Sequence, residues 1–458
     1  MKKYSHYVLM IFIIGLLFQL GLQWIMRPYA INGYLFQAWT SENFMQTVSI
    51  EDLRNAPLES LANIHIQPPG YDALRALLVQ FWPSLEIHAA LKQVDLSIYF
   101  LWSIAYSLGG VVIFLWLAEM TNVNFALASA LLFLLHPAWI HYATFLDTTL
   151  PSSLMILWMF YLLWRIRMGE APVRSLILVV LLLFFVRSLF QLPFIPVIGL
   201  TLFLLKMPAR KLVLFLVVIS TVFGLYIFKQ KRQFNLASTS SFTGINLTSS
   251  VTFTDYDHPY AFDMEEDTTG TLPSVLARTE KISGTINYNN YQYLYYNKRL
   301  TNKFVKFLEK FPVRKLTNNY LENLAIYFAP SSRYTTPHVI VDRLPWRNAY
   351  DWLFSAPVLP ALLAGAGLIA LAQIFKEKSF ATGLAMLLPA FYVFILCVLF
   401  EKGENNRYKF FLEPVYYVFI FSQFFNLYTG IRAGKLDAGK TNKPHSIRKA
   451  DRIEQLST

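Results

Sequence analysis

The chain has 458 residues, of which 55% are hydrophobic and only 15% are charged, and its formal net charge is +12. A soluble globular domain carries about 25% charged residues, whereas here the apolar residues gather in runs long enough to cross a bilayer. This excludes an ordinary soluble domain. In a membrane protein, much of the positive charge is expected in cytoplasmic loops that face membrane lipids. No nucleic-acid partner is therefore expected.

The first apolar run, residues 8–26, follows Lys2 and Lys3. These lysines predict a cytoplasmic N-terminus by the positive-inside rule. A cleaved signal peptide is the alternative, but the run ends in Gln-Trp-Ile-Met-Arg and has no small-residue cleavage site. We therefore predict an uncleaved first transmembrane helix.

Later apolar runs predict helices at 97–118, 124–142, 150–164, 211–228, 352–375, 380–400 and 411–428. Residues 175–205 are flanked by basic residues and interrupted by Arg187 and two prolines, which predicts a hairpin of two short, partly re-entrant helices. The expected fold is an all-α polytopic membrane protein with about ten transmembrane helices. Both termini are expected in the cytoplasm, and a bacterial inner membrane is the expected location.

Two polar segments are expected to form large loops at the outer face. The first, residues 28–95, lies within an N-terminal transmembrane region of residues 1–228 and has three basic and seven acidic residues. The second is residues 229–350, in which residues 299–315 predict a basic amphipathic helix on the membrane surface. Residues 351–430 are expected to form the C-terminal transmembrane helices, and residues 431–458 a basic cytoplasmic tail without stable structure.

Acids at the outer ends of the helices are the candidate catalytic groups. Asp147 precedes the helix at 150–164, where an acid either caps the helix or takes a proton from an incoming hydroxyl. Asp72 follows Pro68-Pro69-Gly70, where a helix is expected to begin. Glu42 lies earlier in the same loop and is the third candidate.

Cations at the same ends are the candidate binding groups. Arg187 lies within an apolar stretch, where an arginine is costly and marks a functional candidate. Arg407 and Lys409 precede the last apolar run and are suited to a phosphate, the arginine through paired donors and the lysine as a point charge. The rest of the expected binding set is His65, Gln67, Tyr71, Glu404 and Tyr408. Such a set suits a substrate with a lipid tail, a phosphate and a polar head.

No nucleotide or named metal is implied by these motifs. The chain has no P-loop or GxGxxG element, and His136 and His141 lack the spacing of a zinc pair, so both are expected at the membrane interface. The acids are compatible with a divalent metal but supply no specific ligand pattern. The single cysteine, Cys397, lies in an apolar run and is expected to be a small core residue.

These landmarks resemble the GT-C class of membrane glycosyltransferases, which includes the protein O-mannosyltransferases and the aminoarabinose transferase of lipid A. Gln67-Pro68-Pro69-Gly70-Tyr71 resembles their H-x-PP-x-Y element, Asp147 to Ser152 their acid-then-helix element, and Glu404 to Pro414 their late RY…P element. The resemblance covers the layout of residues 1–230 and 350–430. It implies inverting transfer of a sugar from a polyprenyl-phosphate carrier to a glycan, lipid or protein acceptor at the outer face.

The sequence departs from the class just after the first helix, where the class usually has an acidic general base. Residues 27–34 read Arg-Pro-Tyr-Ala-Ile-Asn-Gly-Tyr, and the first acid is Glu42. Either the missing acid is replaced by Glu42, Asp52, Asp72 or Asp147, or the protein does not catalyse a reaction. The other hypotheses are a polymerase or ligase of lipid-linked oligosaccharides, a non-catalytic sugar-lipid-binding subunit, and a transporter or flippase, which the scarcity of midplane charge disfavours.

Overall fold

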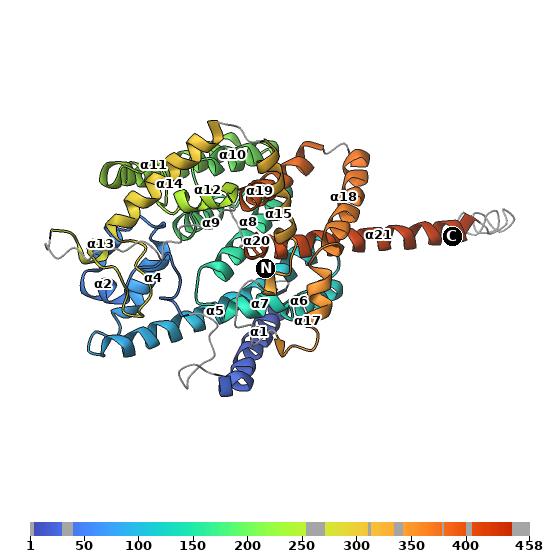
Figure 1. Ribbon diagram of the computed structural model, residues 1–458. Helices are drawn as coiled ribbons and strands as arrows, with labels where there is room; N and C mark the ends of the chain where they lie inside the picture. The colour runs from blue at the N-terminus through green and yellow to red at the C-terminus, as the bar shows by residue number, and fades with distance from the viewer. Residues whose placement is uncertain are drawn as a thin grey trace.

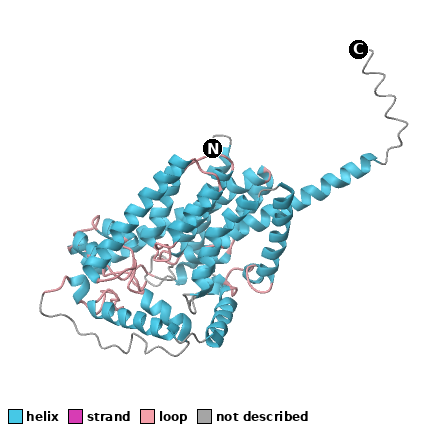
Figure 2. Cartoon of the chain, turned by 90° about the horizontal axis from the view of Figure 1, so that it is seen from above, coloured by secondary structure: helices cyan, strands magenta, loops and turns pink. Residues whose placement is uncertain are grey.

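The computed structural model describes residues 4–29, 40–252, 271–309, 313–333, 342–377, 380–399 and 405–441. Helices make up 76% of the described residues, and none of these residues lies in a strand. The expected all-α class is therefore confirmed. The helices pack into one body, from which the C-terminal part of α21 projects (Figure 1, Figure 2).

The long helices are α1 (Ser5–Met26), α5 (Ile87–Met120), α6 (Val123–Leu134), α8 (Thr149–Arg167), α9 (Val173–Val186), α10 (Phe194–Leu204), α11 (Ala209–Phe234), α14 (Tyr291–Glu309), α15 (Val313–Tyr327), α18 (Val358–Glu377), α19 (Phe380–Leu399) and α21 (Glu413–Thr441). Shorter ones are α2 (Ile50–Asn55), α3 (Pro57–Ala62), α4 (Gly70–Val79), α7 (Pro137–Ala143), α12 (Thr243–Thr252), α13 (Ser274–Ala277), α17 (Arg347–Leu353) and α20 (Asn405–Lys409). Two 3₁₀ turns, η2 (Arg27–Tyr29) and η4 (Ser331–Arg333), complete the set.

Five of these helices, α1, α5, α8, α11 and α18, are long and apolar enough to cross a bilayer. A sixth span results if α6 and α7, which meet at an angle of 57°, are one broken span. The break follows from His136 in extended backbone and Pro137 at the first position of α7, because proline cannot donate the helical hydrogen bond. Several apolar helices thus support a membrane protein, while the count of ten stays a prediction.

Helix α5 lies at the centre of the bundle and holds the region in which Asp147 lies. It packs against α1, α6 and α8. Its Trp102 donates a hydrogen bond from Nε1 to the carbonyl of Asp147 at 2.8 Å. The helix begins at Ile87, ten residues before the predicted apolar run, because the Glu86 carboxylate caps its first turn by accepting from the backbone N–H of His88 and Ala89.

The two polar segments expected at the outer face contact each other directly. The Ser274 hydroxyl donates to Asp52 Oδ1 at 2.6 Å, and the backbone N–H of Ser241 donates to the carbonyl of His65 at 2.8 Å. The side-chain oxygen of Asn289 accepts from the backbone N–H of His65 at 2.9 Å. Residues of both segments therefore lie at the same end of the bundle.

Three local expectations need correction. The amphipathic helix begins at Tyr291, eight residues before the predicted start, and its Leu300 is buried in the chain beside α12 and does not face a membrane. Residues 432–441, expected in the unstructured tail, continue α21, since they contain good helix formers and no proline. His136 and His141, expected at the membrane interface, are buried inside the bundle where aromatic rings surround them.

Candidate functional site

Four buried side chains from three parts of the chain meet in what we call the arginine centre: Asp147, Thr149, Arg187 and Arg407. The Thr149 hydroxyl accepts from Arg407 Nε at 3.0 Å and from Arg187 Nη2 at 3.2 Å, and it donates to Asp147 Oδ2 at 2.7 Å. One hydroxyl has one proton and two lone pairs, so these three bonds use it completely. Arg407 Nη2 also pairs directly with Asp147 Oδ2.

Local backbone structure brings each group to this point. Asp147 lies two residues before the first residue of α8, and its Oδ1 accepts from the backbone N–H of Thr149 at 2.8 Å, so it satisfies one of the free donors at the start of the helix. Arg187 ends α9 in extended backbone, which directs the chain away from the helix axis. Arg407 lies in α20, the short helix before α21.

Aromatic rings surround both guanidinium groups. The ring of Phe44 lies 5.7 Å from Cζ of Arg187 and 5.7 Å from Cζ of Arg407. Arg187 also lies over Tyr408 and Phe411, and Arg407 over Phe145. Such contacts hold a cation in an apolar setting through the negative face of each ring.

The centre brings two guanidinium groups to one hydroxyl and one carboxylate. Arg187 is 4% exposed and Arg407 is 2% exposed, so both groups lie out of bulk water. A pair of guanidinium groups at one point suits a phosphate, because the planar fork of an arginine matches the oxygens of that group.

A cavity of about 230 Å³ opens on the Arg187 side of the centre. Its polar lining comes from Arg187, Ser188, Gln191, Thr243, Asn246, Tyr392 and Tyr408. These residues belong to the α9–α10 connection, α12, α19 and α20. The cavity therefore lies between apolar helices and the polar residues of the second outer segment.

A second buried group, here named the acid–base cluster, comprises Glu42, Asp72, Arg75 and Lys281. Arg75 Nη1 donates to Asp72 Oδ1 at 2.7 Å, and its Nη2 lies 3.5 Å from Glu42 Oε1. Lys281 Nζ donates to the carbonyls of Glu42 at 2.8 Å and Phe44 at 2.9 Å. The cluster thus pins the loop after α1 to the second polar segment.

Burial changes the protonation of this cluster. It lowers the pKa of Lys281 to about 7, an effect that Glu42 opposes and Arg75 reinforces. It raises the pKa of Asp72, an effect that Arg75 opposes. Asp72 Oδ2 has no hydrogen-bond partner among the described residues.

The two groups are neighbours. The ring of Phe44 contacts both arginines, and the carbonyl of Phe44 accepts a hydrogen bond from Lys281. Tyr71 bridges them on another side, since its hydroxyl donates to the carbonyl of Leu146, directly before Asp147, and its neighbour is Asp72. The three predicted acids and two of the predicted cations therefore gather in one region.

Lys409 and His65 have other surroundings. Lys409 Nζ donates to the carbonyls of Ala329 and Phe354, at 2.7 and 2.5 Å, and pairs with Glu413 at 3.1 Å, so its three protons are used within the protein. His65 Nδ1 lies 2.8 Å from the Ser241 hydroxyl, and complete burial lowers its pKa to about 3.

The other predicted binding residues lie partly at the polar cavity and partly elsewhere. Tyr408 lines the polar cavity. Gln67 is buried, and its side-chain amide has no hydrogen-bond partner in the described part of the chain. Glu404 lies outside the described residues. Within the described residues no three His, Cys, Asp or Glu side chains lie close enough to hold a metal.

Four residues of this region were not in the predicted set. Thr149 is two residues after Asp147, and Arg75 is one helical turn after Asp72, so local spacing could have suggested both. Phe44 and Lys281 have no such signal, because their partners are distant in sequence.

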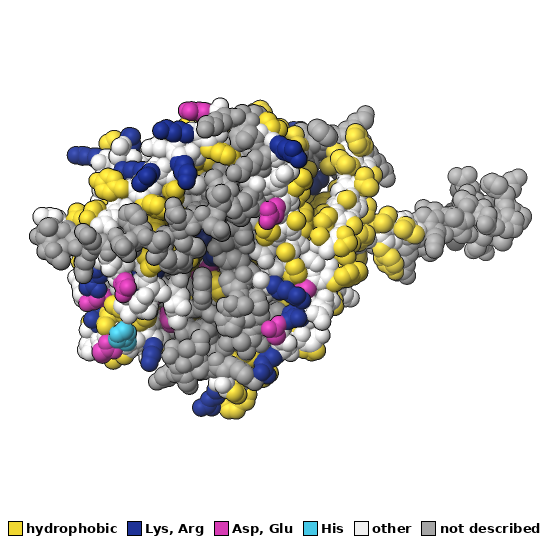
Figure 3. All heavy atoms as spheres, viewed as in Figure 1, with side chains coloured by type: hydrophobic (Ala, Val, Ile, Leu, Met, Phe, Trp, Pro, Cys, Tyr) yellow, Lys and Arg dark blue, Asp and Glu magenta, His cyan; other side chains and the backbone are white. Residues whose placement is uncertain are grey.

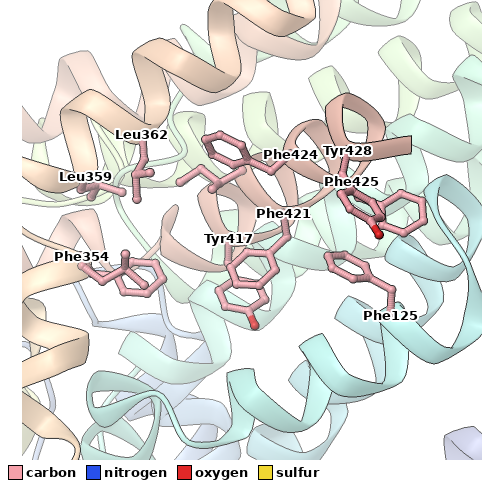
Figure 4. Close-up of a pocket in the computed structure, with 11 residues that line it drawn as sticks. Phe125, Phe354, Leu359, Leu362, Tyr417, Phe421, Phe424, Phe425 and Tyr428 are labelled. Atoms are coloured by element: carbon pink, nitrogen blue, oxygen red, sulfur yellow. The ribbon is translucent and has the colours of Figure 1, made fainter. Parts of the chain in front are cut away.

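A separate apolar groove of about 480 Å³ runs along α21. Figure 4 shows Tyr417, Phe421 and Phe425 on one wall, with Phe125 of α6 on one side and Phe354 and Leu359 on the other. One end of the groove adjoins Lys409, since Phe354 lines the groove and its carbonyl accepts from Lys409 Nζ.

Comparisons of the chain with protein families, with curated proteins and with solved structures found no match.

Proposed function

We propose that the protein is a membrane glycosyltransferase that transfers a sugar from a polyprenyl-phosphate donor to a glycan, lipid or protein acceptor. The observation that supports this best is the arginine centre, in which two buried guanidinium groups meet at Thr149 and Asp147 beside apolar helices. A lipid-linked sugar phosphate combines an anion with the apolar and polar surfaces that surround this centre.

In this proposal Arg187 and Arg407 bind the phosphate, and Asp147 and Thr149 hold the two guanidinium groups in place. When the bond between the sugar carbon and the phosphate oxygen breaks, its electron pair goes to that oxygen, and the arginines stabilise the added charge. The polar cavity beside Arg187 accommodates the sugar, and the apolar groove along α21 is the surface suited to part of the polyprenyl tail.

The acceptor hydroxyl must lose its proton to a carboxylate of the protein as it attacks the sugar carbon. Asp147 and Glu42 each have both carboxylate oxygens engaged by protein donors. Asp72 has one oxygen without a hydrogen-bond partner among the described residues, and burial raises its pKa, which makes its carboxylate a stronger base than that of an exposed aspartate. We therefore assign the general base to Asp72.

Transport of a lipid-linked sugar is the second candidate function. The break between α6 and α7 favours it, because transporters place binding groups at broken helices. His136 lies at this break, buried, with its Nε2 3.7 Å from Glu413 Oε2. A transporter would move the labelled lipid across the bilayer without cleaving it.

The test is transfer by the purified, reconstituted protein from a panel of radiolabelled polyprenyl-phosphate sugars into membrane extract. We expect Arg187→Gln, Arg407→Gln and Asp72→Asn each to reduce transfer by about 10²-fold or more. Arg165→Gln is the matched control, because Arg165 pairs with Glu119 and Glu170 at the far end of α8. Full transfer by all three variants would refute the proposed site, and movement of uncleaved donor across the vesicle would favour transport.

A further inference from the structure

Helix α11 shows where the membrane surface lies on this side of the protein. One exposed stripe runs from Val213 through Leu225 to Phe228, whose side chains are 58%, 64% and 63% exposed. The stripe continues into exposed Lys231 and Arg232, and exposed Arg210 and Lys211 precede it. The 21 residues from Lys211 to Lys231 span roughly 30 Å, which is about the hydrocarbon thickness of a bilayer. Lys231 and Arg232 therefore lie at the level of the lipid headgroups.

Helix α14 has an exposed basic stripe next to this level. Arg299, Lys303 and Lys306 are exposed and follow one another at intervals of four and three residues, so they share one side of the helix. Exposed Tyr295 extends the same side, as expected for an aromatic residue at a membrane interface. The opposite side is occupied, because Tyr293, Leu294 and Leu300 are buried and α14 packs against α12.

The C-terminal end of α11 lies near the middle of α14. Figure 1 shows the two helices next to each other, and Lys231 of α11 is close enough to Lys298 of α14 to lower its pKa further, beyond the effect of burial. Residues 229–234 and 291–309 together contain seven Lys or Arg and one acid, Glu309, a net charge of +6. Figure 3 shows Lys and Arg side chains gathered over α11 and α14, at the upper left of that view.

We propose that the basic stripe of α14, together with Lys231 and Arg232, binds the headgroups of anionic phospholipids. The partner follows from position: the apolar stripe of α11 ends directly beside these cations, so phosphate groups of the bilayer are the anions at that height. Clustered cations attract anionic lipids within about a Debye length of the surface, and high salt screens this attraction. The inference does not depend on the reaction proposed above.

The experiment measures which lipid gathers beside α14. Asn302 is exposed next to the stripe, and the native Cys397 is buried, so Asn302→Cys gives a selectively labelled donor dye. The protein is reconstituted in phosphatidylcholine nanodiscs containing a trace of acyl-labelled acceptor lipid, either phosphatidylglycerol or phosphatidylcholine. We expect several-fold enrichment of phosphatidylglycerol near the dye at low salt and a ratio near one at about 1 M salt.

The triple variant Arg299→Gln, Lys303→Gln, Lys306→Gln should reduce the enrichment to near one. Its matched control removes three exposed cations at the other end of α11: Lys206→Gln, Arg210→Gln and Lys211→Gln. A Tyr295→Cys label repeats the measurement if Asn302→Cys folds poorly. Equal transfer to both lipids, equal loss in the control variant, or binding of a soluble polyanion without phosphatidylglycerol enrichment would each overturn the proposal.

Discussion

Replacing Thr149 by valine tests whether the arginine centre is held by one hydroxyl. Valine keeps the shape of threonine but removes one acceptor from Arg187, one acceptor from Arg407 and one donor to Asp147. Each of these hydrogen bonds involves a buried ionised group, for which the net contribution is at least about 1 kcal/mol. The three together predict a loss of about 3 kcal/mol.

This loss corresponds to roughly a hundredfold change in an equilibrium constant. Since unfolding entropy is about 2.1 cal/mol/K per residue, a chain of 458 residues should lose only about 1 °C in Tm per kcal/mol. Thr149→Val is therefore expected to lower the apparent Tm by about 3 °C. It should weaken binding of farnesyl phosphate, a short polyprenyl phosphate, by at least about tenfold, because both arginines lose their fixed orientation.

The adjacent residue supplies the control. Thr148 is also fully buried, but its hydroxyl has no hydrogen-bond partner among the described residues. Thr148→Val should therefore leave both readouts almost unchanged, and Thr149→Ser should retain most of the wild-type behaviour. The apparent Tm is measured by tryptophan fluorescence during heating, and binding is measured by ligand titration in detergent. Equal effects of the two valine substitutions would show that the hydroxyl of Thr149 does not organise the centre.

Three further changes test other parts of the structure. Gly70→Ala would put a methyl group 2.6 Å from the carbonyl oxygen of Phe185, near the end of α9, so it should lower the free energy of unfolding by about 1–3 kcal/mol. Gly224→Ala is the control, because the added methyl group meets nothing within 4 Å, and it should be neutral or stabilising in the same thermal scan. His65 has a pKa of about 3 in the folded protein against about 6.5 in the unfolded chain. Its stabilisation of the folded state is therefore complete above pH 6.5. As the pH falls from 6.5 towards 3, the free energy of unfolding decreases by about 1.4 kcal/mol per pH unit. His65→Asn should flatten the fall in apparent Tm between pH 6.5 and 4, and an unchanged slope would contradict the assignment. Lys409→Met leaves buried Glu413 without its cation and should cost about 3–5 kcal/mol, part of which a second substitution, Glu413→Gln, should restore.

Patterns of neighbouring residues predicted much of the secondary structure. Most of the apolar runs lie within helices, although the run at 124–142 is broken at His136 and the run at 352–375 is broken between α17 and α18. The helix expected at or just after Pro69 begins at Gly70. The buried position of Cys397 is also as predicted. These features depend on local properties, namely apolar length and the missing donor of proline.

The convergence of distant residues could not be predicted in the same way. Arg187 and Arg407 are 220 positions apart, yet both donate to one hydroxyl. Charge patterns predicted that both arginines lie at the same face of the membrane. That face is much wider than one hydrogen-bonding site, so the prediction did not bring the two side chains together. The shared atom depends on packing among α8, α9 and α20, for which the linear sequence has no periodic signal.

Arg407 and Lys409 show how local geometry separates two similar cations. The sequence suggested that they act together on one phosphate. They lie two positions apart in α20, and two helical residues point about 200° apart at 3.6 residues per turn. Arg407 therefore reaches Asp147, while Lys409 reaches Glu413 on another side.

The contacts of the buried cations indicate which of them suit an anionic substrate. Lys409 donates to two carbonyls and pairs with Glu413, so its protons are used within the protein. In the arginine centre, two guanidinium groups meet at one hydroxyl and one carboxylate, and the planar fork of each arginine suits the oxygens of a phosphate. Replacing either arginine by glutamine should therefore weaken binding of farnesyl phosphate more than Lys409→Met does in the same titration, and equal losses would contradict the assignment of the phosphate site to the arginines.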